Sequence, residues 1–163
     1  MYRALKLIHI LGFALFLGSI MGHIVAARVA PGTADPAVLI YARDTVILAA
    51  RAVTLPGLAM IIVSGIAMTR LGPADLPRQG WFRAHSALSV PITVATLAII
   101  AAASDLADLS RALAAGRGSL AGFAGPEAVE RGLGAVNILA ILASAAVAVV
   151  RRRARPVRAV SAT

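Results

Sequence analysis

Residues 4–27 read ALKLIHILGFALFLGSIMGHIVAA. A helix needs about 20 apolar residues to cross a bilayer, and this run is long enough. It is longer than the core of a secretory signal and has no clear cleavage site, so we expect a retained membrane helix. Two of the three histidines of the chain, His9 and His23, lie within it. Ionisable side chains at membrane depth are costly and often functional, so the histidines are the first candidates for a site.

The composition extends this interpretation to the whole chain. Of 163 residues, 60% are hydrophobic and only 14% are charged, whereas about a quarter is usual for a soluble domain. Further apolar runs predict spans at about 45–69, 82–103 and 131–150, with a basic tail at 151–163. We therefore predict an all-α integral membrane four-helix bundle that forms one domain in the lipid bilayer. The absence of cysteine excludes disulfides, thiolate metal sites and covalently attached haem.

The basic residues divide unevenly between the two ends of this predicted bundle. Ten fall on the side of both chain termini and five on the other side. Cytoplasmic loops are rich in Lys and Arg, which predicts cytoplasmic N and C termini in a bacterial inner membrane. The net charge of +9 is then a topology signal, and we expect no nucleic-acid partner. The ten are Arg3, Lys6, Arg70, Arg78, Arg83 and the five arginines of the tail.

The segment between the last two predicted spans, residues 104–130, begins with leucines spaced three or four residues apart. This pattern predicts an amphipathic continuation of the third helix that lies at the outer membrane interface. Glycines and Pro126 are expected to end it.

The spacing of the histidines indicates a cofactor site. His9 and His23 are separated by roughly 21 Å along one helix and point to within about 40° of the same direction. His85 lies near the start of the third span, at the same predicted depth as His9. We predict haem b between helices one and three, with His9 and His85 as axial ligands of the haem iron. Gly12, one turn from His9, would let the flat macrocycle approach the backbone.

The outer level has no second histidine, but polar residues gather there. We expect His23 and Arg51 to form an outer pocket, with Asn137 at a similar depth. Arg51 would pair a carboxylate there, or else extend to the interface without a partner. Asn137 is alternatively a hydrogen bond between helices.

Two other interpretations remain open. Met21, Met60 and Met68 together with His23 would suit a copper or small-solute transporter. Gly18 and Gly22 form a GxxxG motif, which permits close helix packing and is compatible with a homo-oligomer or a non-catalytic assembly partner.

Several short motifs stand out, namely LKLIHILG at 5–12, FLG at 16–18, RDTV at 43–46, TLPG at 54–57, SG at 64–65 and GW at 80–81. They resemble a bacterial family of predicted integral membrane proteins, domain of unknown function 2269. More distantly, the chain resembles the HemJ-type protoporphyrinogen oxidase and CopD-like membrane domains. The likeness to the oxidase implies haem binding by His9, whereas His85 stands where the oxidase has a functional lysine after its tryptophan.

Together these observations predict a b-type haem protein of redox function, either an electron carrier or a haem-dependent membrane oxidoreductase. Its redox partner would be in the membrane or the periplasm.

Overall fold

The computed structural model describes residues 1–29 and 35–150, and the predicted basic tail, 151–163, lies outside them. The helices are α1 (Tyr2–Val29), α2 (Pro36–Ala49), α3 (Leu55–Leu71), α4 (Gly80–Ala114) and α5 (Ala124–Val150). A π-helical turn, η2 (Ala50–Thr54), joins α2 and α3 into one rod, and short 3-10 turns lie at η3 (Leu76–Arg78) and η4 (Leu120–Phe123). The described residues contain no strand. The predicted all-α bundle of four membrane helices is therefore confirmed.

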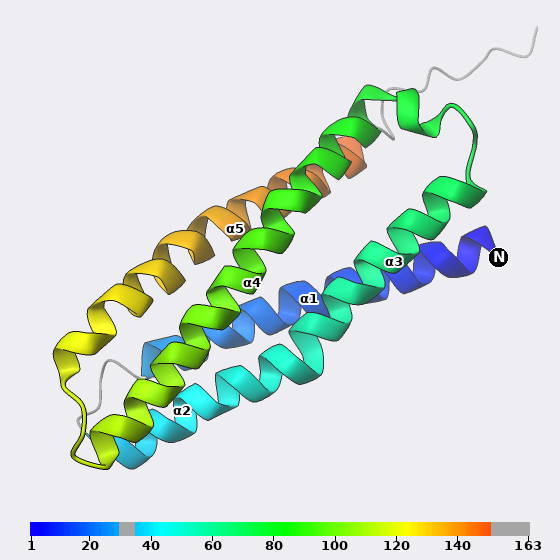
Figure 1. Ribbon diagram of the computed structural model, residues 1–163. Helices are drawn as coiled ribbons and strands as arrows, with labels where there is room; N and C mark the ends of the chain where they lie inside the picture. The colour runs from blue at the N-terminus through cyan, green and yellow to red at the C-terminus, as the bar shows by residue number, and fades with distance from the viewer. Residues whose placement is uncertain (30–34, 151–163) are drawn as a thin grey trace, which may run out of the picture.

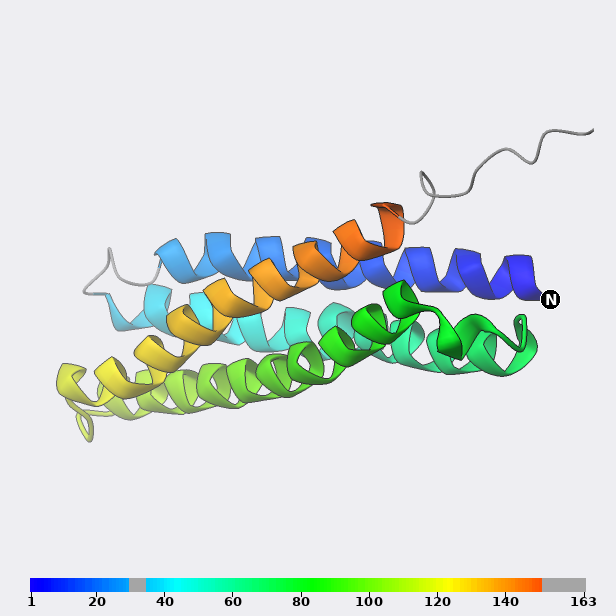
Figure 2. The ribbon, with the colours of Figure 1, turned by 90° about the horizontal axis from the view of Figure 1, so that it is seen from above.

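The four rods run antiparallel along one another (Figures 1 and 2). The N-terminus, the connection from α3 to α4 and the end of α5 lie together, and we call this the near end. The connection from α4 to α5 and the start of α2 lie at the opposite end, which we call the far end.

The rods pack as two pairs. α1 packs along α3, and α4 packs along α5. Between the pairs, the main contacts are those of α2 with α4. The pairs are consequently joined most firmly toward the far end, and a space between them is left toward the near end.

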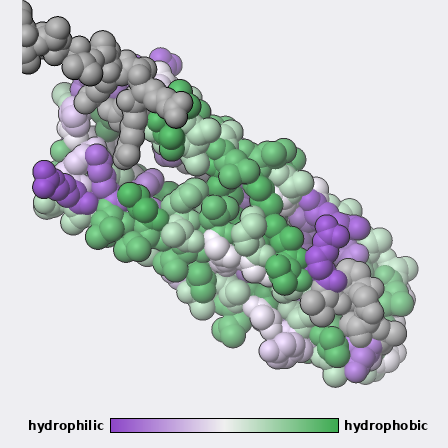
Figure 3. Space-filling model, turned by 180° about the vertical axis from the view of Figure 1, so that it is seen from behind, coloured by the Kyte–Doolittle hydropathy of each residue, from purple (hydrophilic) through white to green (hydrophobic). Residues whose placement is uncertain are grey.

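On the face seen in Figure 3, apolar residues cover the middle of the bundle and hydrophilic residues gather toward both ends. All four rods are long and apolar enough to span a membrane. The rod Pro36–Leu71 and helix Gly80–Ala114 have 36 and 35 residues. At about 1.5 Å per residue each is roughly 50 Å long, well beyond the ~30 Å hydrocarbon core. Their far-end portions carry most of their charges, so we expect these portions to extend beyond the bilayer.

The second helix begins nine residues earlier than predicted, at Pro36 instead of 45. Asp35 caps it by accepting a hydrogen bond from the Ala37 amide at 2.9 Å, and Pro36 suits the first helical turn. Similarly, α5, which corresponds to the fourth predicted span, begins at Ala124 instead of 131. In both cases charged residues that suggested a connection lie within the helix.

A buried ion cluster explains how these charges are accommodated. Arg43 is only 2% exposed and donates to Glu130 at 2.9 Å and to Glu127 at 3.3 Å. Nearby on the surface, Arg111 pairs with Asp108 at 2.8 Å and with Asp44. We call the first set the Arg43 clamp, because it ties α2 to α5 at the far end.

The amphipathic continuation of the third predicted helix is present, but its position was predicted wrongly. α4 continues as one helix to Ala114, and Leu106 is completely buried. Its apolar partners are Leu39 and Ala42 of α2 and Phe123 of η4. The apolar stripe therefore packs on protein and does not lie along the membrane surface.

Candidate functional site

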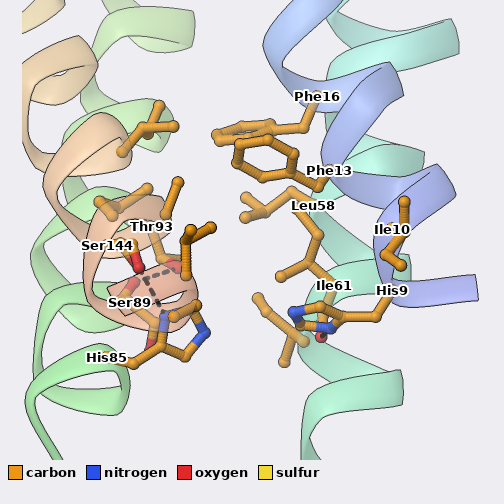
Figure 4. Close-up of a pocket in the computed structure, with 16 residues that line it drawn as sticks. His9, Ile10, Phe13, Phe16, Leu58, Ile61, His85, Ser89, Thr93 and Ser144 are labelled. Atoms are coloured by element: carbon orange, nitrogen blue, oxygen red, sulfur yellow. Dashed lines mark hydrogen bonds between the residues drawn. The ribbon is translucent and has the colours of Figure 1, made fainter. Parts of the chain in front are cut away.

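A cavity of about 370 Å³ lies between the two helix pairs toward the near end (Figure 4). His9 of α1 lines one wall and His85 of α4 lines the other. Most other lining side chains are apolar, including Phe13 and Ile10, and Ser89 and Ser144 add hydroxyl groups. This size and character are usual for a small-molecule or cofactor site. We call it the near cavity.

His9 is held by α3. Its Nδ1 is 3.1 Å from the carbonyl oxygen of Ile61 and 3.0 Å from Ser64 Oγ. A carbonyl can only accept, so Nδ1 carries the proton, and Ser64 in turn donates its own proton to the Met60 carbonyl. The lone pair of His9 is therefore on Nε2.

His85 is held in the same manner by α5. Its Nδ1 is 3.2 Å from the Ser144 carbonyl oxygen and 2.8 Å from Ser144 Oγ. The carbonyl again places the proton on Nδ1 and the lone pair on Nε2. Among the described residues neither Nε2 atom has a hydrogen-bond partner, and in Figure 4 both face the space between the walls.

The pairing of His9 with His85 was predicted from depth alone, and the structure brings the two together. Their ring centroids are 6.3 Å apart and the ring planes are inclined by 56°. Metal–imidazole bonds are about 2.0–2.1 Å and each nitrogen is about 1.1 Å from its ring centre, so two axial imidazoles place their centroids slightly over 6 Å apart. Histidines that bind metals usually fix their other nitrogen to a carbonyl, as both do here.

The donor set limits which metal group would fit. No group of three or more His, Cys, Asp or Glu side chains in the described residues could hold a metal ion. Two imidazoles suffice for a metal that brings its remaining ligands with it, such as haem iron. The apolar walls also suit a macrocycle, so the residues present fit haem.

An apolar layer closes the near cavity toward the far end. It consists of Phe16, Leu58, Ile92 and Ile141, each at most 7% exposed and each on a different rod. We call these four side chains the plug.

A second cavity, of about 620 Å³, begins one helical turn beyond the plug. Each rod contributes one plug residue. Four positions from it, in the direction of the far end, the same rod contributes a residue that lines this far cavity. The second residues are Ile20, Thr54, Thr96 and Asn137.

The predicted outer pocket corresponds in part to this far cavity. His23 and Asn137 line it, but Arg51 does not. Arg51 is exposed within the π-helical turn and has no ion-pair partner in the described chain. Pro56 explains the turn, because it lacks the amide proton for a regular helical bond and Leu55 bonds to Ala50 instead.

Gly12 was predicted to face the macrocycle, and this placement was wrong. It lies against α3, where an added Cβ would be 2.8 Å from Met60 Cβ and 2.9 Å from the Gly57 oxygen. A Cβ added at Gly57 would be similarly close to the Phe16 amide nitrogen. The two glycines let α1 and α3 approach closely, which supports His9 indirectly through helix packing.

The other two predicted groupings are not assembled. Met21 is exposed and does not line the far cavity, and Met60 packs beside Gly12. At Gly18 and Gly22 an added Cβ would meet nothing within 4 Å, so this GxxxG motif packs on no other described helix.

Ser64 and Ser144 are the contributors that the sequence reasoning missed. Both are buried hydroxyls in apolar spans, a pattern that often indicates a hydrogen bond between helices. Their partners lie 55 and 59 residues away in the chain, so spacing could not identify them.

Comparison with known proteins identifies the family. The family profile described as predicted integral membrane protein (DUF2269) matches residues 3–152. No curated protein and no solved structure matches the chain significantly. The profile covers nearly the whole chain, both histidine walls included, and the protein therefore belongs to the DUF2269 family of predicted integral membrane proteins.

Proposed function

We propose that this protein is a membrane electron carrier that holds one haem b in the near cavity. The observation that carries the proposal is the pair of free Nε2 atoms on His9 and His85, in rings 6.3 Å apart with both Nδ1 atoms fixed by carbonyls. His9 and His85 would be the axial ligands. The resemblance of the first helix to the HemJ-type oxidase stays a prediction that agrees with this assignment.

The donor set favours electron transfer over catalysis at the metal. Held by both His9 and His85, a haem would have no open iron position for a substrate and would supply reversible one-electron chemistry. The protein contributes ligand identity, apolar walls and the hydrogen bonds to Nδ1, which fix the orientation of the imidazoles. Ser64 and Ser144 are positioning residues in this proposal.

Cations toward the near end suit the carboxylates of the haem. Lys6 and Arg83 are exposed and precede His9 and His85 by three and two residues. In the sequence, five more arginines follow directly after α5, and this excess of basic residues on the side of the termini supports a cytoplasmic near end and an inner-membrane location.

The test is spectroscopic, on full-length protein purified from cells supplied with haem. We expect a Soret band and a reduced-minus-oxidised difference spectrum of low-spin haem. His9→Ala and His85→Ala should each lose the low-spin signature, whereas His23→Ala, the matched control, should keep it. Ser144→Ala should keep the haem but shift its midpoint potential, because one bond to His85 is lost. A colourless folded protein, or unchanged spectra in both ligand variants, would refute the proposal.

A further inference from the structure

The far cavity holds a deep hydrogen-bond acceptor that the protein leaves unused. Asn137 is 3% exposed and its Nδ2 donates to Thr96 Oγ1 at 3.0 Å. Thr96 gives its own proton to the Ile92 carbonyl at 2.8 Å, so it can only accept from Asn137. This fixes the orientation of the amide and leaves Oδ1 without a partner among the described residues.

A buried acceptor without a donor is destabilising, so its presence in a cavity suggests a ligand that supplies the donor. Asn137 lines the cavity one helical turn from Ile141 of the plug, so it lies at the deep end for any molecule that enters from the far end. The ligand must therefore carry a hydroxyl or N–H group at its leading edge.

The α1 side of the cavity offers a second acceptor. Ser19 Oγ is 2.6 Å from Thr54 Oγ1, and Thr54 has the Ala49 carbonyl at 3.5 Å for its own proton. Ser19 then donates to Thr54 and accepts from His23 Nε2 at 3.4 Å. With its proton on Nε2, His23 keeps a lone pair on Nδ1.

The remaining walls define the body of the ligand. They are aliphatic, formed largely by Ile20, Ile24, Ile99, Ile100 and Ile138. The charged residues of the lining are Arg28 and Arg131, together with Glu130, which Arg43 already binds. The cavity therefore suits an apolar, membrane-soluble molecule with more than one hydroxyl donor.

We propose that the far cavity binds a membrane hydroquinone, a flat ring with two opposed hydroxyl groups. One hydroxyl donates to Asn137 Oδ1 and the other to the acceptor on His23. The isoleucines contact the faces of the ring. A sterol or a fatty alcohol has a single donor and would satisfy only one of the two walls.

The binding test uses the full chain in lipid nanodiscs under anaerobic conditions, titrated by calorimetry with a benzohydroquinone that carries a short alkyl tail. The chain has no cysteine, so the reductant that maintains the hydroquinone does not alter its covalent structure. The dimethyl ether of the same compound has the same ring without the donors. We expect saturable binding of the hydroquinone and at least tenfold weaker binding of the ether.

Two glycines of α5 provide matched variants. An added Cβ meets nothing within 4 Å at Gly134, which lines the cavity, or at Gly132, which does not. Gly134→Leu should fill the cavity and abolish binding, and Gly132→Leu should leave binding unchanged. Asn137→Leu should weaken binding at least tenfold.

Equal binding of hydroquinone and ether, or unchanged binding in Gly134→Leu, would overturn the proposal, as would the absence of saturable binding. No haem spectrum is read in this titration. Failure here therefore leaves the haem proposal standing, and the loss of haem in the histidine variants leaves this one standing.

Discussion

Because Arg43 of the clamp is buried, we expect its replacement to destabilise the protein much more than the replacement of an exposed arginine that also contacts two carboxylates. Arg43 is 2% exposed, and its partners Glu130 and Glu127 are 13% and 28% exposed. Arg43→Met fills similar space but leaves two carboxylates near each other without a cation. Breaking a buried pair by removing one partner costs about 3–5 kcal/mol, and the partial exposure of Glu127 places this case near about 3 kcal/mol.

Arg111 is the matched control. It also contacts two carboxylates, Asp44 and Asp108, but it is 51% exposed. Exposed pairs contribute roughly 0–1 kcal/mol, so Arg111→Met should change the free energy of unfolding by less than about 1 kcal/mol.

The assay is reversible unfolding in mixed micelles, followed by circular dichroism as the denaturing detergent is increased. A triple variant, Arg43→Met with Glu127→Gln and Glu130→Gln, should recover more than half of the loss, because no uncompensated charge remains. If Arg43→Met and Arg111→Met agree within about 0.5 kcal/mol, the clamp does not stabilise the bundle as we argue.

Two further predictions concern helix packing and orientation. Gly12→Ala should destabilise the protein by about 1–3 kcal/mol, because the added Cβ overlaps α3. Gly18→Ala has free space around the added Cβ and should leave the stability unchanged. Equal unfolding curves for the two variants would contradict the contact between Gly12 and α3. Single cysteines can report the orientation, because the chain has none of its own. Ala74→Cys, in the connection between α3 and α4, should react with a membrane-impermeant thiol reagent only after the cells are opened. Ser119→Cys, at the far end, should react with the same reagent in intact spheroplasts. The reverse pattern would place the near end outside.

The sequence predicted the number of helices because apolar runs long enough to cross a bilayer have few other structures available to them. It did not predict where the helices end. Arg43 and Asp44 are typical of a connection when read locally, but they are helical because their partners, Glu127 and Arg111, come from distant segments.

Packing between distant segments also limited what could be predicted about the site. Helix direction fixes depth along the membrane, so the sequence placed His9 and His85 at the same level, and their rings lie 6.3 Å apart. Rotation about the helix axis is set by packing, which sequence spacing does not contain. Gly12 therefore turned out to face α3, and Arg51 lies outside the far cavity.

The plug has a consequence for the membrane voltage. An electrical potential falls most steeply across the least polarisable material, and the plug is one layer of apolar side chains between two cavities. With water in both cavities, much of the potential would drop across this layer and less across the full bilayer. Moving one elementary charge through the whole potential is worth about 2.3 kcal/mol per 100 mV. A charge that crosses at Phe16 would therefore feel a large share of the membrane potential over a very short distance.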